Sequence, residues 1–126
     1  MTDTRFASVP DNQARQSDVV DVGQEARNIA LRTLSYSAKT RHQLEHKLQV
    51  KGIPAEYIQE VLVWLEEIGL IDDQAYADMY VRSRCASKQI SRSSLMRELR
   101  TKGVAEEILR ESVAAISDDD EYKLAL

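Results

Sequence analysis

The 126-residue chain contains few of the residues that shape folds other than helical ones: two prolines, four glycines, one tryptophan and one phenylalanine. Alternating runs of β-branched residues, the usual signal of strands, are also missing. Apolar residues nevertheless make up 43% of the chain, which is enough for globular packing. We therefore expect an all-α protein.

The single cysteine, Cys85, excludes a disulfide framework within the chain and suits a reducing compartment. No run of apolar residues is long enough to cross a bilayer. The opening "MTDTRFASVPDNQ" lacks the apolar core of a signal peptide. We therefore expect a cytoplasmic protein with no membrane association.

One helical pattern occurs twice. "RHQLEHKLQVKGI" at residues 41–53 is followed by "RSSLMRELRTKGV" at residues 92–104, an offset of 92 − 41 = 51. Two leucines four apart before a Lys-Gly stop are common in helices, so these features alone could match by chance. The pairs that coincide at this offset are Leu44 and Leu95, Leu48 and Leu99, Lys51 and Lys102, Gly52 and Gly103, Glu56 and Glu107, and Glu60 and Glu111. The period predicts repeated three-helix units, because a module this small stacks on its neighbour to bury its apolar face.

Composition and capping signals divide the chain around these repeats. Residues 1–22 are polar and aperiodic, which predicts a disordered tail. The first repeat is expected at residues 23–70 and the second at residues 71–117. The remaining "DDDEYKLAL", residues 118–126, is interpreted as the start of a truncated third repeat.

Helix boundaries follow from local chemistry. Thr40 and Gln43 have the spacing of a capping box, and Gly52 is expected to end the helix that follows them. Asp72 and Asp73 are expected to cap the fourth helix, which should run to about residue 86. The side chains expected to face inward from the third and fourth helices include Trp64, Ile68, Ala75, Tyr76, Met79 and Tyr80.

Charges are separated along the chain. The net charge of −4 and the pI near 5.2 do not favour a generic nucleic-acid binder, which is usually basic. Residues 54–78 carry seven acids and no lysine or arginine, whereas residues 79–104 carry seven bases and one acid, Glu98. Such blocks predict a surface with separate bands of opposite sign. Solvated helix faces with ion pairs between neighbouring turns are the ordinary alternative.

No combination of residues predicts an enzyme. His42, Glu45 and His46 have the H-x-x-E-H form of an inverted zinc-protease motif. The second copy has Ser93 and Arg97 in place of the histidines, and no third ligand is evident, so an exposed histidine pair is the better interpretation. A lone cysteine is more often a small packing residue than a reactive thiol. We expect no catalytic residues, no metal and no cofactor.

The segment "ALRTLSYSAKTRHQLEHKLQVKGIPAEYIQEVLVWLEEIGLIDDQAYADMYVRSR" resembles the start of the RecX family, the bacterial regulators of the RecA recombinase. The matching features are the A-L-x-x-L-S opening, the L-x-x-K-L…K-G-I helix and the G-L-I-D-D-x-x-Y-A turn. "RELRTKGV" resembles the second-repeat motif of that family. The resemblance covers about two thirds of the chain, from Ala30 to about Val113.

The resemblance implies a monomeric all-α protein with tandem three-helix repeats in an elongated, curved array. It implies that the protein binds the filament formed by RecA on single-stranded DNA. It also implies inhibition of the recombinase and ATPase activities and of filament extension. A direct DNA-binding helical module without RecA dependence is the alternative, and a plain helical scaffold is a third hypothesis.

Charge and geometry suggest which residues would make these contacts. Candidates for DNA phosphates or acidic RecA surface are Arg82, Arg84, Lys88, Arg92, Arg97, Arg100 and Lys102, with Arg41, Lys47 and Lys51 in the first copy. Candidates for a RecA-facing acidic stripe are Glu56, Glu60 and Glu67.

Overall fold

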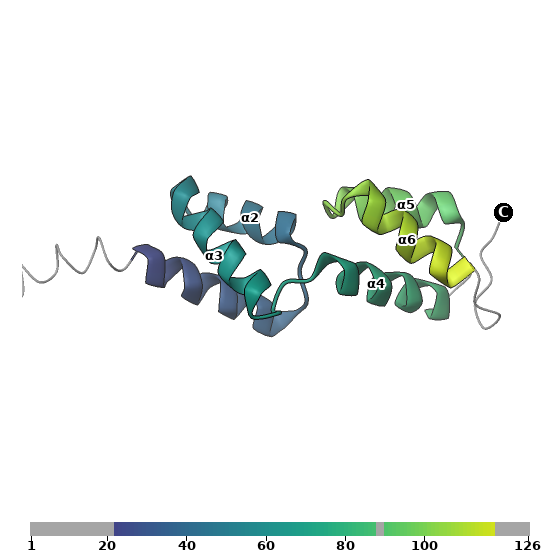
Figure 1. Cartoon of the computed structure of the whole chain (residues 1–126), viewed down its shortest axis with the longest axis horizontal. Coiled ribbons are helices and arrows are strands. Elements are labelled where there is room, and N and C mark those ends of the chain that lie inside the picture. Colours follow the sequence, from purple (N-terminus) through teal and green to yellow (C-terminus); the bar gives the residue numbers. More distant parts are fainter. Residues whose placement is uncertain (1–21, 88–89, 118–126) are drawn as a thin grey trace, which may run out of the picture.

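The computed structural model describes residues 22–87 and 90–117, and every regular element within these ranges is a helix. Residues 22–36 are helical and are followed by α2 (Arg41–Val50) and α3 (Ala55–Glu67). The second half contains α4 (Asp73–Ser87), α5 (Arg92–Thr101) and α6 (Glu106–Ser117). Two three-helix units lie one after the other along the long axis of the molecule (Figure 1). The all-α repeat fold is thereby confirmed. Val22, the last residue of the predicted tail, is already helical, and the rest of that tail and the predicted third repeat lie outside the described residues.

Equivalent helices of the two units begin and end in the same way. Thr40 caps α2 as half of a complete capping box with Gln43, and Ser91 caps α5 by accepting from the amide of Ser94. Gly52 and Gly103 follow the two helices with φ angles of 83° and 85°. The next amides bond back to the carbonyls of Leu48 and Leu99, each at 3.1 Å, which is the Schellman arrangement. The sequence repeat is therefore a repeat of helix caps as well as of apolar spacing.

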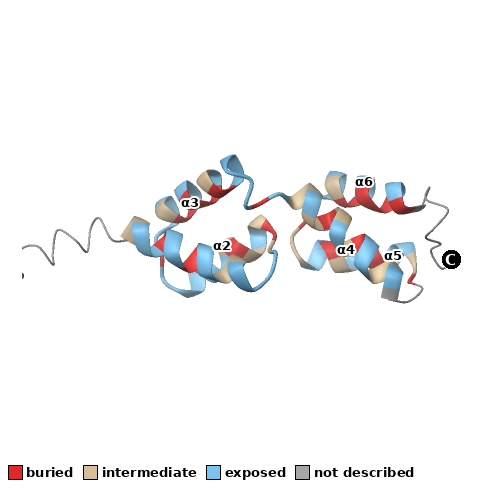
Figure 2. Cartoon of the chain, turned by 90° about the horizontal axis from the view of Figure 1, so that it is seen from below, coloured by how far each residue is buried: buried red, intermediate tan, exposed pale blue. Residues whose placement is uncertain are grey.

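Each unit has its own apolar core, visible as buried inner faces in Figure 2. The first core contains Ala26, Ile29, Ala30, Leu44, Leu48, Ile53, Ile58, Val61, Leu62, Leu65 and Ile71. The second contains Ala77, Val81, Ile90, Leu95, Leu99, Val104, Leu109, Val113 and Ile116. The repeated leucines of α2 and α5 are fully buried in these cores. Each apolar interior is thus built from residues of one unit, which corrects the expectation that a unit buries its apolar face by stacking on its neighbour.

The expected inner face of α4 is wrong at two positions. Ala75 is exposed and Met79 is 49% exposed, whereas Ala77 and Val81, four residues apart, form the buried line. Tyr76 and Tyr80 are half-buried and pack against the second core as expected. The buried side of α4 is therefore centred on Ala77 and Val81, with the two tyrosines beside this line and not at its centre. Ala75 and Met79 consequently lie on the exposed side of the helix.

The apolar arc of α3 is also narrower than expected. Ile68 follows the helix as its C-cap residue and is 50% exposed. Trp64 is half-buried against the first core, and the guanidinium of Arg27 lies 4.4 Å from its ring centroid. The indole is thus in contact with the first core and also makes a cation–π contact.

The two units meet where α2 begins. The buried Thr40 donates its hydroxyl hydrogen bond to the carbonyl of Lys102, 2.6 Å away at the end of α5. The carboxylate of Asp73, at the start of α4, accepts from the amide of Arg41 at 2.9 Å. Its pKa is raised, mainly because burial disfavours the charged form. Free polar groups at three helix ends thereby satisfy one another, which fixes the orientation of the two units.

Candidate interaction surfaces

Arg84 is held in an ion pair within the second unit. Its guanidinium donates to both carboxylate oxygens of Glu98, at 2.9 and 3.0 Å, and the hydroxyl of Tyr80 donates to the same carboxylate. The hydrogen bonds from Arg84 and Tyr80 lower the pKa of Glu98 to about 2. Burial, followed by the hydrogen bond to Glu98, raises the pKa of Tyr80 to about 12. This cluster joins α4 to α5, so Arg84 stabilises the packing of the second unit.

Two further bases of the predicted basic block at residues 79–104 also have partners. Arg100 donates to both oxygens of Glu106, at the start of α6, and Arg110 approaches the same carboxylate at 3.5 Å. The hydrogen bonds from Arg100 are the main cause of the lowered pKa of Glu106. The ammonium of Lys102 lies 5.1 Å from the ring centroid of Tyr80. These contacts leave less uncompensated positive charge on the second unit than its sequence suggests.

The other predicted bases of this block lie on two different helices or outside the described residues. Arg82, Arg92 and Arg97 are exposed, on α4 and α5, and Lys88 lies outside the described residues. Arg97 forms no ion pair with any residue that the structure describes. Among the bases predicted in residues 79–104, Arg97 is therefore the best placed to contact an anionic partner.

In the first unit, Arg41 is a structural residue. It lies 3.3 Å from a carboxylate oxygen of Glu66 and donates to Gln59 at 3.1 Å, both on α3. Gln59 in turn donates to Glu45 of α2 at 3.0 Å. These bonds bind α2 to α3, so the prediction that Arg41 contacts an external partner is weakened.

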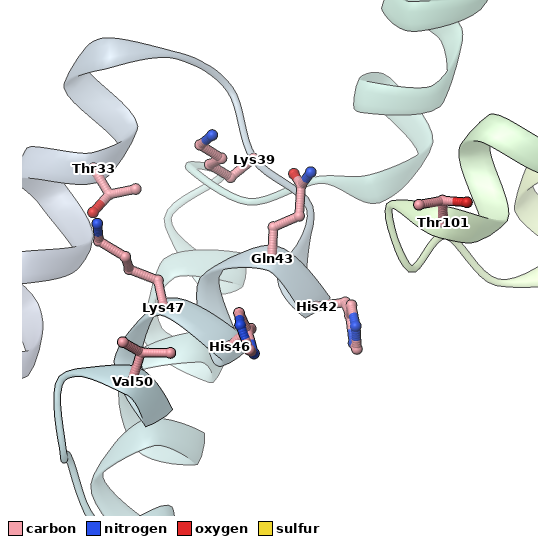
Figure 3. A pocket seen from close by; sticks show the side chains of 8 residues that line it. All are labelled: Thr33, Lys39, His42, Gln43, His46, Lys47, Val50 and Thr101. Carbon is pink, nitrogen blue, oxygen red and sulfur yellow. The ribbon is translucent and has the colours of Figure 1, made fainter.

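Lys47 and Lys51 point away from the core and line open grooves. One groove, of about 470 Å³, is bounded by the first helix, the length of α2 and the end of α5 (Figure 3). In Figure 3, Lys47 extends toward Thr33 of the first helix, and His42 and His46 follow one another along α2. A second groove, of about 290 Å³, is lined by both lysines together with Arg32, Lys39 and Tyr36.

Arg32, Lys39 and Tyr36 were not predicted as site residues. They come from the end of the first helix and the loop after it, so no helical periodicity links them to Lys47 and Lys51. The signal in the sequence is weak but present: "LRTLSYSAKT" places one base on each side of an aromatic residue among small polar ones. Only the packing of the first helix on α2 brings these residues together.

The predicted acidic residues lie on α3. Glu56, Glu60 and Glu67 are exposed, and none forms an ion pair with a residue in the described ranges. Their spacing of four and seven residues places them on one side of the helix. A stripe of unpaired acidic charge therefore runs along α3, on a different helix from the basic grooves of α2.

Neither a metal site nor a reactive thiol is supported by the geometry of the described residues. No group of three or more His, Cys, Asp or Glu within residues 22–87 and 90–117 is arranged to hold a metal ion. His42 and His46 are both exposed. Burial is the main cause of a raised pKa of Cys85, which disfavours the nucleophilic thiolate. No helix in the described part of the chain has the length and apolar character needed to cross a membrane.

Comparison with known proteins accounts for the two units. The profile of the RecX first three-helix domain matches residues 26–65, and that of the RecX second three-helix domain matches residues 72–112. The chain belongs to the RecX family. The RecX name thus applies to both three-helix units, in the order in which they occur here.

Individual relatives agree with this assignment. The chain is 40% identical over 105 residues to the regulatory protein RecX of Streptomyces coelicolor, covering 83% of this chain and 56% of that protein. It is 36% identical over 119 residues to RecX of Mycolicibacterium smegmatis, covering 94% and 63%. The crystal structure of RecX from Lactobacillus salivarius superposes with a TM-score of 0.76 at 30% identity, covering 79% of this chain and 64% of that one. The chain therefore spans 56% to 64% of the length of these relatives.

Proposed function

We propose that this RecX-family chain binds the filament that RecA forms on single-stranded DNA, and that it inhibits recombinase and ATPase activity and filament extension. The observation that carries the proposal is the succession of two RecX units locked together at the start of α2. A filament presents the same surface at regular intervals, and two units in fixed orientation can engage two such surfaces at once. Binding both sites gives an avidity that one unit lacks.

The charged surfaces give this proposal its chemistry. The acidic stripe of Glu56, Glu60 and Glu67 faces basic RecA surface, while exposed bases such as Arg97 and Lys47 face DNA phosphates or acidic RecA surface. Opposite charges on separate helices favour one orientation over others, because the wrong orientation brings like charges together. The protein would act as a monomer in the cytoplasm, in DNA repair and the SOS response.

The test is the rate of ATP hydrolysis by RecA on single-stranded DNA as the protein is added. We expect hydrolysis to fall, and Arg97→Glu to weaken the effect more than Arg110→Glu, the matched control. Both substitutions change the charge by the same amount on an exposed helix face of the second unit. A plain scaffold would leave hydrolysis unchanged with every variant, and that result would overturn the proposal.

Direct DNA binding without RecA remains the second candidate because the grooves beside Lys47 are basic. A salt titration separates the two functions. Binding to bare single strands should weaken with a log–log slope of about −0.7 for each phosphate neutralised. If the filament is the target, the protein should bind it much more tightly than the bare strand at the same salt concentration.

A further inference from the structure

The two grooves of the first unit form one channel. Both are lined by Thr33, Lys39 and Lys47, so the larger groove continues directly into the smaller one. The channel runs between the first helix and α2, and Thr101 of α5 lines the larger groove from the side of the second unit (Figure 3). Because helices on both sides are packed on the first core, the walls of the channel are held by the fold itself.

Positive charge in this channel is not compensated by any carboxylate of residues 22–87 and 90–117 that lines it. Arg32, Lys39, Lys47 and Lys51 line it, and no described carboxylate lines either groove. None of the four bases forms an ion pair with another described residue, in contrast to Arg84 and Arg100 of the second unit. Lys47 and Lys51 are one helical turn apart, about 6 Å along the axis. Four unpaired cations along a channel favour a linear polyanion over a single small anion.

Tyr36, an exposed aromatic side chain at the smaller groove, favours a single-stranded nucleic acid over other linear polyanions. Tyr36 is 83% exposed, the largest exposed fraction among the large apolar and aromatic side chains that the structure describes. It ends the first helix and lines the groove beside Lys39 and Lys51. Proteins that bind single strands combine a basic groove for the backbone with exposed aromatic rings on which bases stack. Bases inside a duplex have no free face for such a ring.

We propose that this channel holds a segment of single-stranded nucleic acid, with its phosphates along Lys39, Lys47, Lys51 and Arg32 and one base stacked on Tyr36. The proposal rests on the function proposed above, since the filament contains such a strand. It names the first unit, and not the basic block of the second, as the DNA-facing part of the chain. The proposal for the filament is tested by ATP hydrolysis, whereas the proposal for the channel is tested by binding of a bare oligonucleotide.

The test uses fluorescence anisotropy of a labelled oligothymidylate of about 20 nucleotides, without RecA, at several salt concentrations. Lys39→Gln combined with Lys47→Gln should weaken binding at least about 10-fold and make the salt slope shallower by about 1.4, since two contacts are lost. Arg110→Glu, which changes the net charge by the same amount on α6, should leave affinity and slope close to those of the wild type. Equal weakening by both variants would overturn the proposal.

The role of Tyr36 needs its own pair of variants. Tyr36→Ala should weaken binding about 5-fold or more, whereas Tyr36→Phe, which keeps the aromatic face, should bind like the wild type. Unchanged binding by Tyr36→Ala would contradict the stacking contact, as would equally tight binding of a duplex of the same length. Circular dichroism confirms that these exposed substitutions leave the helices intact.

Failure of this inference differs from failure of the proposed function. If the wild type inhibits RecA while the channel variants bind the oligothymidylate normally, the channel proposal is wrong and the filament proposal stands. If the channel variants no longer bind the oligothymidylate while the wild type has no effect on RecA, the channel proposal stands and the filament proposal is wrong.

Discussion

Gly103 provides a test of the joint between the two units, because Gly52 is its equivalent in the first unit. Both glycines end a helix with a φ angle near +85°, at 85° and 83° respectively. Alanine in this left-handed conformation costs about 1 kcal/mol at either position. The surroundings differ: a Cβ at Gly52 would meet nothing within 4 Å, whereas at Gly103 it would lie 2.2 Å from the Cβ of His42.

The overlap at Gly103 cannot be relieved by a side-chain rotation. The atom that is met first is the Cβ of His42, which moves only with the backbone of α2. Either α2 shifts away from α5 or the hydrogen bond between Thr40 and the carbonyl of Lys102 breaks. Overpacking of this kind costs about 1–3 kcal/mol. We therefore expect Gly103→Ala to lower the free energy of unfolding by about 1–3 kcal/mol more than Gly52→Ala does.

Urea denaturation followed by circular dichroism measures the difference. With a slope of about 2 kcal/mol per molar urea, an extra 2 kcal/mol shifts the midpoint by about 1 M. In the Gly103→Ala background, His42→Ala should restore little stability because it keeps the Cβ, whereas His42→Gly should remove the overlap. Equal costs for Gly52→Ala and Gly103→Ala would refute the close packing of the units at this point.

Further predictions concern the cluster of α4 and α5 and the cores. The pKa of Glu98 is lowered from 4.5 to about 2, so its contribution to the free energy of unfolding is present above about pH 4.5 and is lost as the pH falls toward 2. The shift in pKa corresponds to about 3 kcal/mol. Because the side chain is 32% exposed, solvent screening reduces this contribution to about 1 kcal/mol. Glu98→Gln should therefore lose about that much at pH 7 and show a flatter acid-unfolding profile, and a profile identical to that of the wild type would contradict the ion pair. Because the pKa of Tyr80 is raised to about 12, its contribution should be lost as the pH rises from 10 to 12, and ultraviolet titration of Tyr80→Phe should lack the latest-ionising tyrosine. Leu48→Ala and Leu99→Ala, at fully buried equivalent positions, should each lower the free energy of unfolding by about 2–5 kcal/mol, and a cost below 1 kcal/mol in urea denaturation would be inconsistent with the separate cores.

Local chemistry predicts the helices well because their boundaries depend on neighbouring residues. The capping box of Thr40 and the glycine that ends each repeated helix follow from a few adjacent positions. The inner face of α4 was harder to predict, since its buried line consists of the small Ala77 and Val81 beside two tyrosines. A weak apolar pattern of this kind allows more than one rotation of the helix.

The interaction surfaces were less predictable than the helices because they depend on contacts between distant residues. A count of bases along the sequence cannot show that Glu98 engages Arg84 or that Glu106 engages Arg100. It also cannot show that Arg32 and Lys39 lie beside Lys47, because this depends on how the first helix packs on α2. The second contact of Thr40, to a carbonyl 62 residues away, has no signature in the local sequence.

The most direct test of the account is a comparison of how tightly the protein binds three targets: the assembled RecA filament, free RecA and bare single-stranded DNA. The measurement is fluorescence anisotropy of labelled protein at one salt concentration. Two rigidly joined units that engage a repeating surface should bind the filament at least about 100-fold more tightly than either component alone. Equal affinity for the filament and for bare single-stranded DNA would contradict the account.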